Sequence, residues 1–525
     1  MTNRMTGAIV GLSIVAACIL ADEPLTVAEK SDFTATSRHA DVTAFCEALA
    51  AKSPVAHFTD MGTSTEGRKI PLLILADPPV RTPAEAKASG KLIVYVQANI
   101  HAGEVDGKEG LLMLARDIAL GSDRALLRNL VLLFCPNFNP DGNERIDARN
   151  RRSQNGPRDG VGVRPNAGGF DLNRDFVKLE TPEVQAFVRI MNEWDPAIAI
   201  DCHTTNGSYH RYLITYDGPR HPNCGAALIE TVRDKCLPDV GERLERKTGF
   251  KSFPYGNFSR DKSRWETYGQ TPRYSSQYGG LRGRIGILSE SYSYAPYKDR
   301  ITASREFVRA WLEYASAHAD EIRRLLATNH PGDAVAVRTS VVPLRRATAL
   351  GYEEETKDGR RVPLLDKPRD YELQLVTRVE PAERAPLPRA YLFPASFSAA
   401  AENLRRHGVI VEELAEDQDL DFEAYRIDTV TQAETPFQKH RETTVQVVRG
   451  ENGSAVQRGR RTLPAGTIVV RTSQPLGMLA AYLLEPRSED GLTTWNFFDD
   501  GLKAGEEFPV VRLAGEPRLK LRAAK

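Results

Sequence analysis

The sequence has few cysteines and no excess of charge of either sign, and both shortages exclude classes of protein. Six of the 525 residues are cysteine, and no two of them form a Cys-x-x-Cys pair. A small disulfide scaffold and a cysteine zinc site are therefore excluded. Lysine plus arginine and aspartate plus glutamate both number 70, so the net charge is zero. Such a chain has no global attraction to nucleic acid or to an anionic membrane, and we expect no nucleic-acid partner.

Long apolar runs are scarce, and the first residues hold a short one. The run AIVGLSIVAACILA, residues 8–21, follows Arg4 and precedes Asp22 and Glu23. It is shorter than the ~20 residues that a transmembrane helix needs, whereas a basic start before a short apolar stretch is typical of an export signal. We therefore predict a signal peptide over residues 1–21, no transmembrane span, and a periplasmic or extracellular protein. A lipid anchor on Cys18 stays open as an alternative.

Residues 30–330 alternate between short apolar runs and helical patterns. Strands are expected at 91–100, 130–138, 197–203 and 283–291, and helices at 107–120, 181–194, 222–247 and 303–325. Near-continuous apolar strands separated by helices indicate a sheet that is covered on both faces. We predict an α/β domain here, with a mixed, mostly parallel central sheet flanked by helices.

Residues 335–525 have a different composition, with segments rich in valine, threonine and arginine and many prolines. This pattern predicts a β-rich C-terminal domain with helices near 398–408 and 477–486. No repeat of fixed period is present. The sequence assigns no role to this region.

Potential metal ligands stand where the predicted strands end. His101 and Glu104 follow the first strand, His203 ends the third, and Glu290 lies near the end of the fourth. Loops at the carboxyl edge of such a sheet converge on a crevice. Two imidazoles and one carboxylate suit a zinc ion with a fourth position open for water, and a further carboxylate can serve as general base. Gly103 is expected to let the backbone turn so that both nearby ligands point inward.

A long basic segment, residues 139–176, follows the second predicted strand. Its glycine, asparagine and proline content marks a loop, and a loop of this length inside a compact domain is usually functional. Arginines beside a metal bind carboxylates through paired hydrogen bonds that lysine does not match. A nucleophilic mechanism has little support, because the chain has no G-x-S-x-G motif and Cys202 and His203 point to opposite faces of a strand.

Five motifs in order resemble the zinc carboxypeptidase family, which includes the pancreatic carboxypeptidases and many bacterial relatives. They are HAGE (101–104), NPDG (139–142), DLNR (171–174), DCH (201–203) and LSES (288–291). The match covers roughly residues 35–325. The resemblance implies a metallocarboxypeptidase that holds one Zn²⁺ ion and hydrolyses the last peptide bond of a substrate with a free C-terminal carboxylate.

The resemblance also implies a role for each matching residue. His101, Glu104 and His203 would be the zinc ligands, and Asp171 would orient the first zinc histidine. Asn173 and Arg174 would hold the terminal carboxylate of the substrate. Glu290 would be the general base, and an arginine of RNRRS would stabilise the oxyanion; Arg151 is the first choice and Arg152 the second.

Several alternatives remain open at this point. The tyrosine that covers the substrate in this family could be Tyr274 or Tyr278, and arginines of residues 251–284 in the side-chain pocket would favour an acidic C-terminal residue. A zinc-dependent amidase or deacylase acting on N-acyl amino acids would use the same scaffold, and cell-wall peptides are a further substrate class. A non-catalytic binding protein is disfavoured, because no ligand or base is missing.

Overall fold

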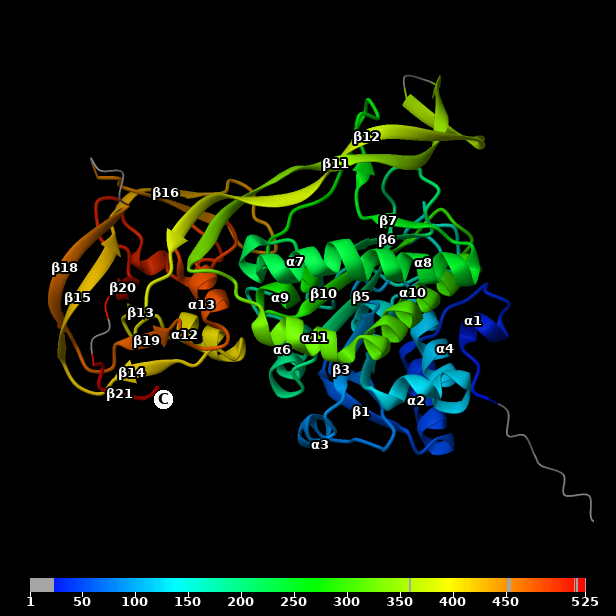
Figure 1. Cartoon of the computed structure of the whole chain (residues 1–525), viewed down its shortest axis with the longest axis horizontal. Coiled ribbons are helices and arrows are strands. Elements are labelled where there is room, and N and C mark those ends of the chain that lie inside the picture. Colours follow the sequence, from blue (N-terminus) through cyan, green and yellow to red (C-terminus); the bar gives the residue numbers. More distant parts are fainter. Residues whose placement is uncertain (1–22, 358–359, 451–454, 514, 516–517, 525) are drawn as a thin grey trace, which may run out of the picture.

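The structure is a computed structural model of the chain (Figure 1). It describes residues 23–524 apart from 358–359, 451–454, 514 and 516–517. The predicted signal peptide, residues 1–21 with Cys18, lies outside the described residues. Among the described residues, no helix has the length and apolar character that are needed to span a membrane.

A central sheet of eight strands organises residues 30–330. Strands β4, β3, β5 and β10 run parallel to one another. Strands β1, β2 and β6 join through antiparallel pairs, and β7 pairs in parallel with β6. The predicted mixed, mostly parallel sheet is confirmed. Its strand order is β1 (Ala56–Thr63), β2 (Lys69–Leu75), β4 (Leu130–Cys135), β3 (Leu92–Ala98), β5 (Ile198–Thr205), β10 (Ile285–Tyr292), β6 (Ile214–Asp217), β7 (Ser252–Pro254).

Helices cover both faces of this sheet, and each face has its own apolar core. Along β3, Val94 and Val96 belong to one core while Ile93 and Tyr95 belong to the other, because successive strand residues point to opposite faces. The first core packs under α2 (His39–Lys52), α4 (Asp106–Leu120), α8 (Leu237–Thr248), α10 (Tyr297–Ala317) and α11 (Ala319–Thr328). The second packs under α6 (Pro182–Glu193) and α9 (Ser275–Leu281).

Two of the predicted helices are interrupted in the structure. The segment expected at 303–325 is two helices, α10 and α11, because His318 between them leaves the helical conformation at φ −117° and ψ 25°. The segment expected at 222–247 is divided into shorter pieces. These pieces are η3 (Pro222–Cys224), α7 (Ala226–Thr231), η4 (Val232–Cys236) and α8. The remaining short helices of this part are α1 (Val27–Lys30), α3 (Pro83–Ala88), η1 (Ser122–Arg128), α5 (Pro140–Asn143) and η2 (Leu172–Arg174).

The C-terminal region, residues 335–525, begins with a long antiparallel hairpin. Its strands are β11 (Ala334–Lys357) and β12 (Arg360–Pro386), and Figure 1 shows the hairpin crossing above the α/β domain. Strand β12 pairs with β9 (Arg264–Glu266), which pairs with β8 (Asn257–Phe258). The hairpin therefore continues a small sheet of the α/β domain.

The rest of the C-terminal region is a second β-rich body, as predicted. One sheet has the order β18 (Val456–Leu463), β15 (Gln418–Tyr425), β20 (Val511–Leu513), β13 (Ala390–Phe393), β19 (Ile468–Arg471), β14 (Glu412–Leu414), β21 (Leu521–Ala523). Strands β16 (Ile427–Gln432) and β17 (Thr443–Val447) form a separate pair. The helices are α12 (Ser398–Arg406), α13 (Gly477–Leu484) and η5 (Asp499–Gly501).

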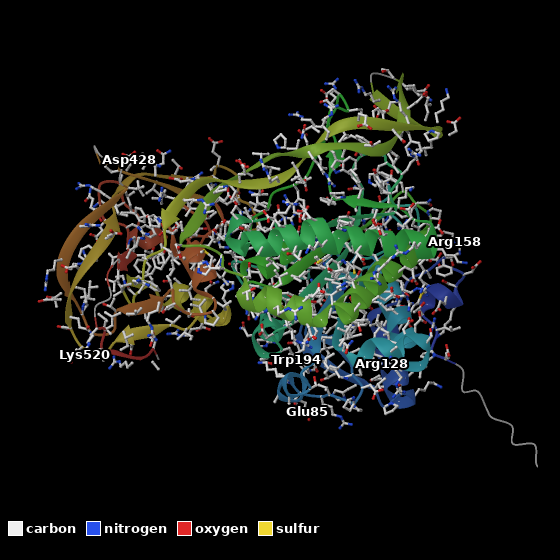
Figure 2. All side chains as sticks on the ribbon, in the orientation of Figure 1. Glu85, Arg128, Arg158, Trp194, Asp428 and Lys520 are labelled. Carbon is white, nitrogen blue, oxygen red and sulfur yellow. The ribbon has the colours of Figure 1, made fainter. Side chains whose placement is uncertain are left out.

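The two bodies share one apolar core. Leu404 of α12 and Leu483 of α13 belong to the same buried cluster as Phe187 of α6. Figure 2 shows Asp428 and Lys520 on the outer side of the C-terminal region, while Arg158 of the basic loop lies at the opposite end of the molecule. The described cysteines are all free and buried: Cys46, Cys135, Cys202, Cys224 and Cys236.

Candidate metal centre

The three predicted zinc ligands meet at the carboxyl ends of β3 and β5. His101 and Glu104 lie between β3 and α4, whereas His203 lies inside β5, two residues before its end. Glu290 of β10 is the direct register partner of His203. Because the two strands are parallel neighbours, both side chains point to the same side of the sheet. All four residues are buried.

The donor atoms of these ligands fit one zinc ion. His101 Nδ1 lies 3.2 Å from His203 Nδ1 and 3.1 Å from Glu104 Oε1, and His203 Nδ1 lies 2.9 Å from Glu104 Oε2. Ligands at zinc distances of about 2.0–2.1 Å in a tetrahedron stand roughly 3.3 Å apart, close to these separations. Within the described residues, this is the one group of three or more histidine, cysteine and acidic side chains close enough to share an ion.

Each histidine turns its second ring nitrogen toward an aspartate. His101 Nε2 lies 3.0 Å from Asp171 Oδ1, the contact that the motif implies for this residue. His203 Nε2 lies 2.9 Å from Asp201 Oδ2, and Ser275 donates its hydroxyl hydrogen bond to the same carboxylate. A carboxylate behind a histidine ligand fixes the ring and raises its basicity. Sequence reasoning missed Asp201, although it stands two residues before His203 on the same face of β5.

Burial and the neighbouring charges shift the pKa values of Glu290 and Glu104 in opposite directions. Burial raises the pKa of the Glu290 carboxyl to about 8, while His203 and the guanidinium of Arg151 oppose that rise. Burial also acts against the ionisation of Glu104, yet contacts with His101 and Arg151 hold its pKa well below the ordinary value. Glu104 is therefore the carboxylate suited to a ligand and Glu290 the one suited to exchanging a proton. A cation in the pocket would lower the pKa of Glu290 by attraction.

Arg151 is the arginine of the RNRRS motif that reaches the pocket. Its Nη1 lies 2.9 Å from Glu104 Oε1, and its Nη2 donates to the Thr204 carbonyl at 2.8 Å. Its backbone has a φ of +48°, which is uncommon outside glycine and is retained where the surroundings require it. Arg152 is exposed and does not line the cleft. A third arginine that the sequence did not single out, Arg164, lines the cleft and pairs with Asp171 at 2.9 Å.

The structure requires a glycine at position 103 for a different reason from the one expected. Its backbone is not left-handed; that conformation occurs at Asn99, where φ is +66°. A Cβ on Gly103 would lie 2.5 Å from Arg151 Cδ and 3.1 Å from the Gly162 carbonyl oxygen. Glycine is therefore required here by the close approach of Arg151 and not by the turn.

The metal residues line a cleft of about 200 Å³ whose opposite wall is aromatic. Asn173 and Arg174 lie on this wall, and the Arg174 guanidinium stacks 4.5 Å from the Tyr274 ring centre. The wall is completed by Tyr255 and Tyr268, which the sequence did not single out. None of the arginines in residues 251–284, all of which are described, lines this cleft, so they give no support to the alternative of a preference for an acidic C-terminal residue.

Tyr278, the alternative to Tyr274, lies outside the cleft. It is fully buried, and its hydroxyl bonds to His407 Nδ1 at 2.8 Å and to Arg282. Tyr278 is one helical turn beyond Tyr274, where helix α9 turns its side chain into the core shared with the C-terminal region. Tyr274 is thus the tyrosine of the two that faces the metal residues.

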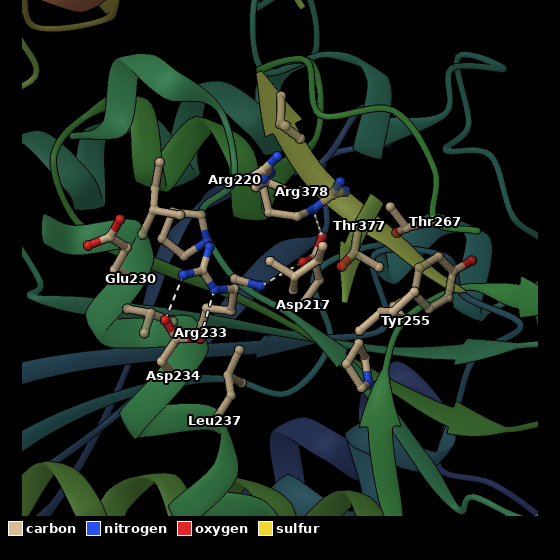
Figure 3. A pocket seen from close by; sticks show the side chains of 18 of the residues that line it. Asp217, Arg220, Glu230, Arg233, Asp234, Leu237, Tyr255, Thr267, Thr377 and Arg378 are labelled. Carbon is tan, nitrogen blue, oxygen red and sulfur yellow. Dashed lines mark hydrogen bonds and ion pairs between the residues drawn. The ribbon is translucent and has the colours of Figure 1, made fainter. Parts of the chain in front are cut away.

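A second cavity, of about 430 Å³, lies between the β11–β12 hairpin and the α/β domain (Figure 3). Charged residues that line it form ion pairs with one another: Arg220 Nε lies 2.7 Å from Asp217, and Arg233 lies 2.6 Å from Asp234. Tyr255 lies at its edge and also lines the metal cleft. Since none of the metal residues lines this larger cavity, we place the candidate site in the smaller cleft.

Comparisons with known proteins agree with this geometry. Residues 42–223 match the family model described as zinc carboxypeptidase. Carboxypeptidase 2 of Trichophyton equinum is 25% identical over 484 residues, covering 86% of this chain and 81% of that protein. That match is longer than the α/β domain and so includes part of the C-terminal region. Carboxypeptidase D of Mus musculus is 32% identical over 206 residues, which are 34% of this chain and 15% of that protein.

Among solved structures, the metallo-carboxypeptidase from Pseudomonas aeruginosa in complex with (2-guanidinoethylmercapto)succinic acid has a TM-score of 0.40 and 20% identity. The similarity covers 54% of this chain and 70% of that one. The family model and the curated relatives agree with the resemblance that the sequence motifs predicted. Over residues 42–223 the chain resembles zinc carboxypeptidases, and these matches support a peptide-bond hydrolase.

Proposed function

We propose that this protein is an exported zinc metallocarboxypeptidase that removes the C-terminal residue of peptides. The observation that carries the proposal is the convergence of the trio His101, Glu104 and His203 with Glu290 in a cleft that also contains Arg174. A metal pocket beside a general base supports hydrolysis, and a guanidinium opposite the pocket supports recognition of a carboxylate. Export rests on the predicted signal peptide, residues 1–21.

The residues that would hold the ion are the trio, with Asp171 and Asp201 fixing the two imidazole rings. When bound, zinc supplies Lewis acidity, which activates water and polarises the carbonyl of the scissile bond. The chain supplies the remaining chemistry. Glu290 accepts the proton of the attacking water and delivers it to the leaving amine, a role that suits a buried carboxyl whose pKa is raised.

We propose that the wall of the cleft opposite the zinc trio orients the substrate. Arg174 and Asn173 are proposed to bind the free carboxylate, and Tyr274 is held beside them by the stacked guanidinium of Arg174. Arg151 is proposed to stabilise the oxyanion, because its guanidinium lies at the edge of the metal pocket. The small, tyrosine-lined cleft would accept one residue beyond the scissile bond.

Zinc analysis combined with mass-spectrometric profiling of a peptide library tests this function. The library contains each peptide with a free and with an amidated C-terminus. We expect one zinc ion per chain, stepwise loss of C-terminal residues from the free peptides, and loss of cleavage on amidation. Internal cuts would contradict the proposal, and release of N-acyl groups would favour the amidase or deacylase alternative on the same scaffold.

A further inference from the structure

The wall of the cleft that carries Asn173, Arg174 and Tyr274 is called the recognition wall below, and two loops of the C-terminal region contact the segments that form it. One is the turn Phe437–Glu442 between β16 and β17, and the other is the segment Asp490–Trp495 after α13. Each contacts a residue within two positions of one that lines the cleft: Gln438 contacts Asp171, and Asp490 contacts Arg273. We call the set Gln438, Glu442, Asp490 and Trp495 the C-terminal clamp.

The first contact is made by a strained turn. Phe437 and His440 exchange backbone hydrogen bonds, so Gln438 and Lys439 form a two-residue turn in which φ is +50° and +68°. Asn-Gly is the pair that such turns prefer, because both residues need a positive φ. Gln438 and Lys439 occupy these positions although a positive φ strains both residues. Backbone strain of this kind is concentrated at functional sites.

Both side chains of the turn reach the loop that carries DLNR. Gln438 Oε1 accepts a hydrogen bond from the Asp171 backbone N–H at 2.9 Å. Lys439 Nζ donates to the Gly168 carbonyl at 2.7 Å and lies 4.0 Å from the Phe170 ring centre. The turn therefore fixes the backbone of the residue that orients His101 and precedes Asn173 and Arg174.

The second contact is a buried ion pair next to Tyr274. The Arg273 backbone N–H donates to Asp490 Oδ2 at 2.8 Å, and Arg273 Nε donates to Asp490 Oδ1 at 2.9 Å. Arg273 also pairs with Glu442 at 2.9 Å and stacks 4.7 Å from the Trp495 ring centre. Asp490 has no exposed surface. Side chain and backbone of Arg273 are thus both fixed, and the direction in which Tyr274 leaves the loop is fixed with them.

The two contacts are joined inside the α/β domain. Asn173 Oδ1 accepts a hydrogen bond from the Ser275 N–H at 2.9 Å. Asn173 also donates its N–H to Asp171 Oδ1 at 3.0 Å. The path therefore runs from Gln438 through Asp171, Asn173 and Ser275 to Arg273, and it closes through Glu442, which pairs with Arg273 and lies in the same turn as Gln438. By contrast, the zinc trio lies on β5 and on the loop between β3 and α4, and Gln438 reaches it only indirectly, through Asp171 behind His101.

We propose that Gln438 and Arg273 are positioning residues through which the C-terminal region sets the recognition wall of the cleft and so determines the affinity for the substrate carboxylate. The inference rests on the proposed function, since it names the regulation of that same site. Loosening the clamp lets Asn173, Arg174 and Tyr274 leave their bound arrangement, while the metal ligands stay in place. KM therefore rises, and zinc content measured at saturating zinc does not change.

The decisive variant is the double substitution Gln438→Asn with Lys439→Gly. It gives the turn its preferred pair, so the turn itself is expected to be more stable, but the shorter side chain no longer reaches Asp171. The variant removes two hydrogen bonds, that of Gln438 with Asp171 and that of Lys439 with Gly168, and the loss of one such bond corresponds to roughly a three- to tenfold change in an equilibrium constant. We expect KM for a peptide with a free C-terminus to rise by at least about the factor for one bond, with kcat and zinc stoichiometry within about twofold of the parent protein.

Glu442→Gln, which weakens one partner of Arg273, is expected to raise KM in the same direction by less. The matched control is Gln432→Ala, which removes hydrogen bonds of the same kind to Asp499 and Thr443 inside the C-terminal region. This control is expected to leave KM unchanged. An unchanged KM in the double variant, or an equal rise in the control, would overturn the proposal, as would a joint loss of zinc and kcat.

Hydrogen–deuterium exchange separates this inference from the proposed function, because it needs no turnover. In the double variant, amides of residues 166–175 and 271–276 are expected to exchange faster, while those of β3 and β5 keep the parent rate. If the parent protein cleaves no peptide, the proposed function fails, and the exchange result still decides whether the clamp positions the wall. Unchanged exchange at 166–175 would overturn the inference.

Discussion

The two walls of the cleft are built in different ways. The metal wall, which carries the proposed zinc ligands and the proposed base, consists of side chains at the ends of neighbouring parallel strands, where the register of the sheet alone brings His203 and Glu290 together. The recognition wall consists of loops, residues 166–174 and 268–274, that are fixed by contacts with a second body far along the chain. The first wall is therefore a property of the α/β domain, whereas the second depends on the whole chain. Chemistry and recognition should accordingly fail separately when they are perturbed.

The largest effect is expected from Glu290→Gln, which keeps the shape of the side chain and removes its ability to take a proton. General acid–base groups contribute about 10²–10⁴ in rate, so kcat should fall by that factor. Zinc content should remain at the parent level, because Glu290 is not one of the ligand trio. Glu416→Gln, at an exposed ion pair with Lys520, is the control. Unchanged peptide hydrolysis with zinc still bound would refute the assignment of the base.

A smaller effect is expected from Asp201→Asn, which weakens the support of His203 without touching the recognition wall. Loss of such a partner lowers metal affinity by about 10–100-fold. Competition with a chelator, followed by the release of zinc, measures this change. Asp141→Asn is a matched control, since Asp141 is also buried and hydrogen-bonded, to Ser64 and Arg68, but does not contact a ligand. An equal loss of zinc affinity in both variants would mean that burial, and not ring support, is responsible.

Gly103→Ala tests the position of Arg151 at the boundary of the two walls. The added Cβ would lie within 2.5 Å of Arg151 Cδ, so the guanidinium must move from Glu104. We expect kcat to fall by about tenfold, as for the partial loss of an oxyanion contact, with zinc retained. Gly515→Ala, where a Cβ meets nothing within 4 Å, should have no effect. Parent-like kcat for Gly103→Ala would remove Arg151 from the mechanism.

The smallest effect is a pH dependence of stability at the turn Phe437–Glu442. His440 bonds to Glu180 Oε1 at 2.8 Å, and this contact raises the pKa of His440, although Lys178 nearby opposes it. A pKa raised in the folded state stabilises below the ordinary histidine value of about 6.5, and the contribution is lost as pH rises through the raised pKa. Thermal unfolding should therefore show His440→Gln to be less stable than the parent at pH 5 and equal to it at alkaline pH. A difference independent of pH would contradict this account.

The metal wall was largely predictable from the sequence, and the recognition wall was not. His101, Glu104, His203 and Glu290 follow apolar strands, and parallel strands bring their carboxyl ends together wherever the strands lie in the chain. The fold class followed from the same alternation of apolar runs and helices. Asp201 was missed because a carboxylate inside a buried strand has no local signal of its own, although its spacing of two from His203 places it on the ligand face.

The recognition wall depends on contacts that the sequence does not encode locally. Arg273 looked like one of several arginines in a basic segment, and only its pairing with Asp490, 217 positions later, distinguishes it. Tyr274 and Tyr278 could not be separated by pattern, since the start of α9 decides which of them faces the cleft. The role of Gln438 needed the packing of two bodies that share one core.

The most direct test of the central claim is the rate at which the zinc-loaded protein cleaves one peptide with a free and with an amidated C-terminus. A guanidinium paired with a carboxylate gains a charge-assisted bond that an amide does not offer. We predict that amidation lowers kcat/KM by at least about 100-fold, which corresponds to roughly 2.8 kcal/mol. Equal rates for the two peptides would contradict the account, because they would show that Arg174 and Asn173 do not bind the terminal carboxylate of the substrate.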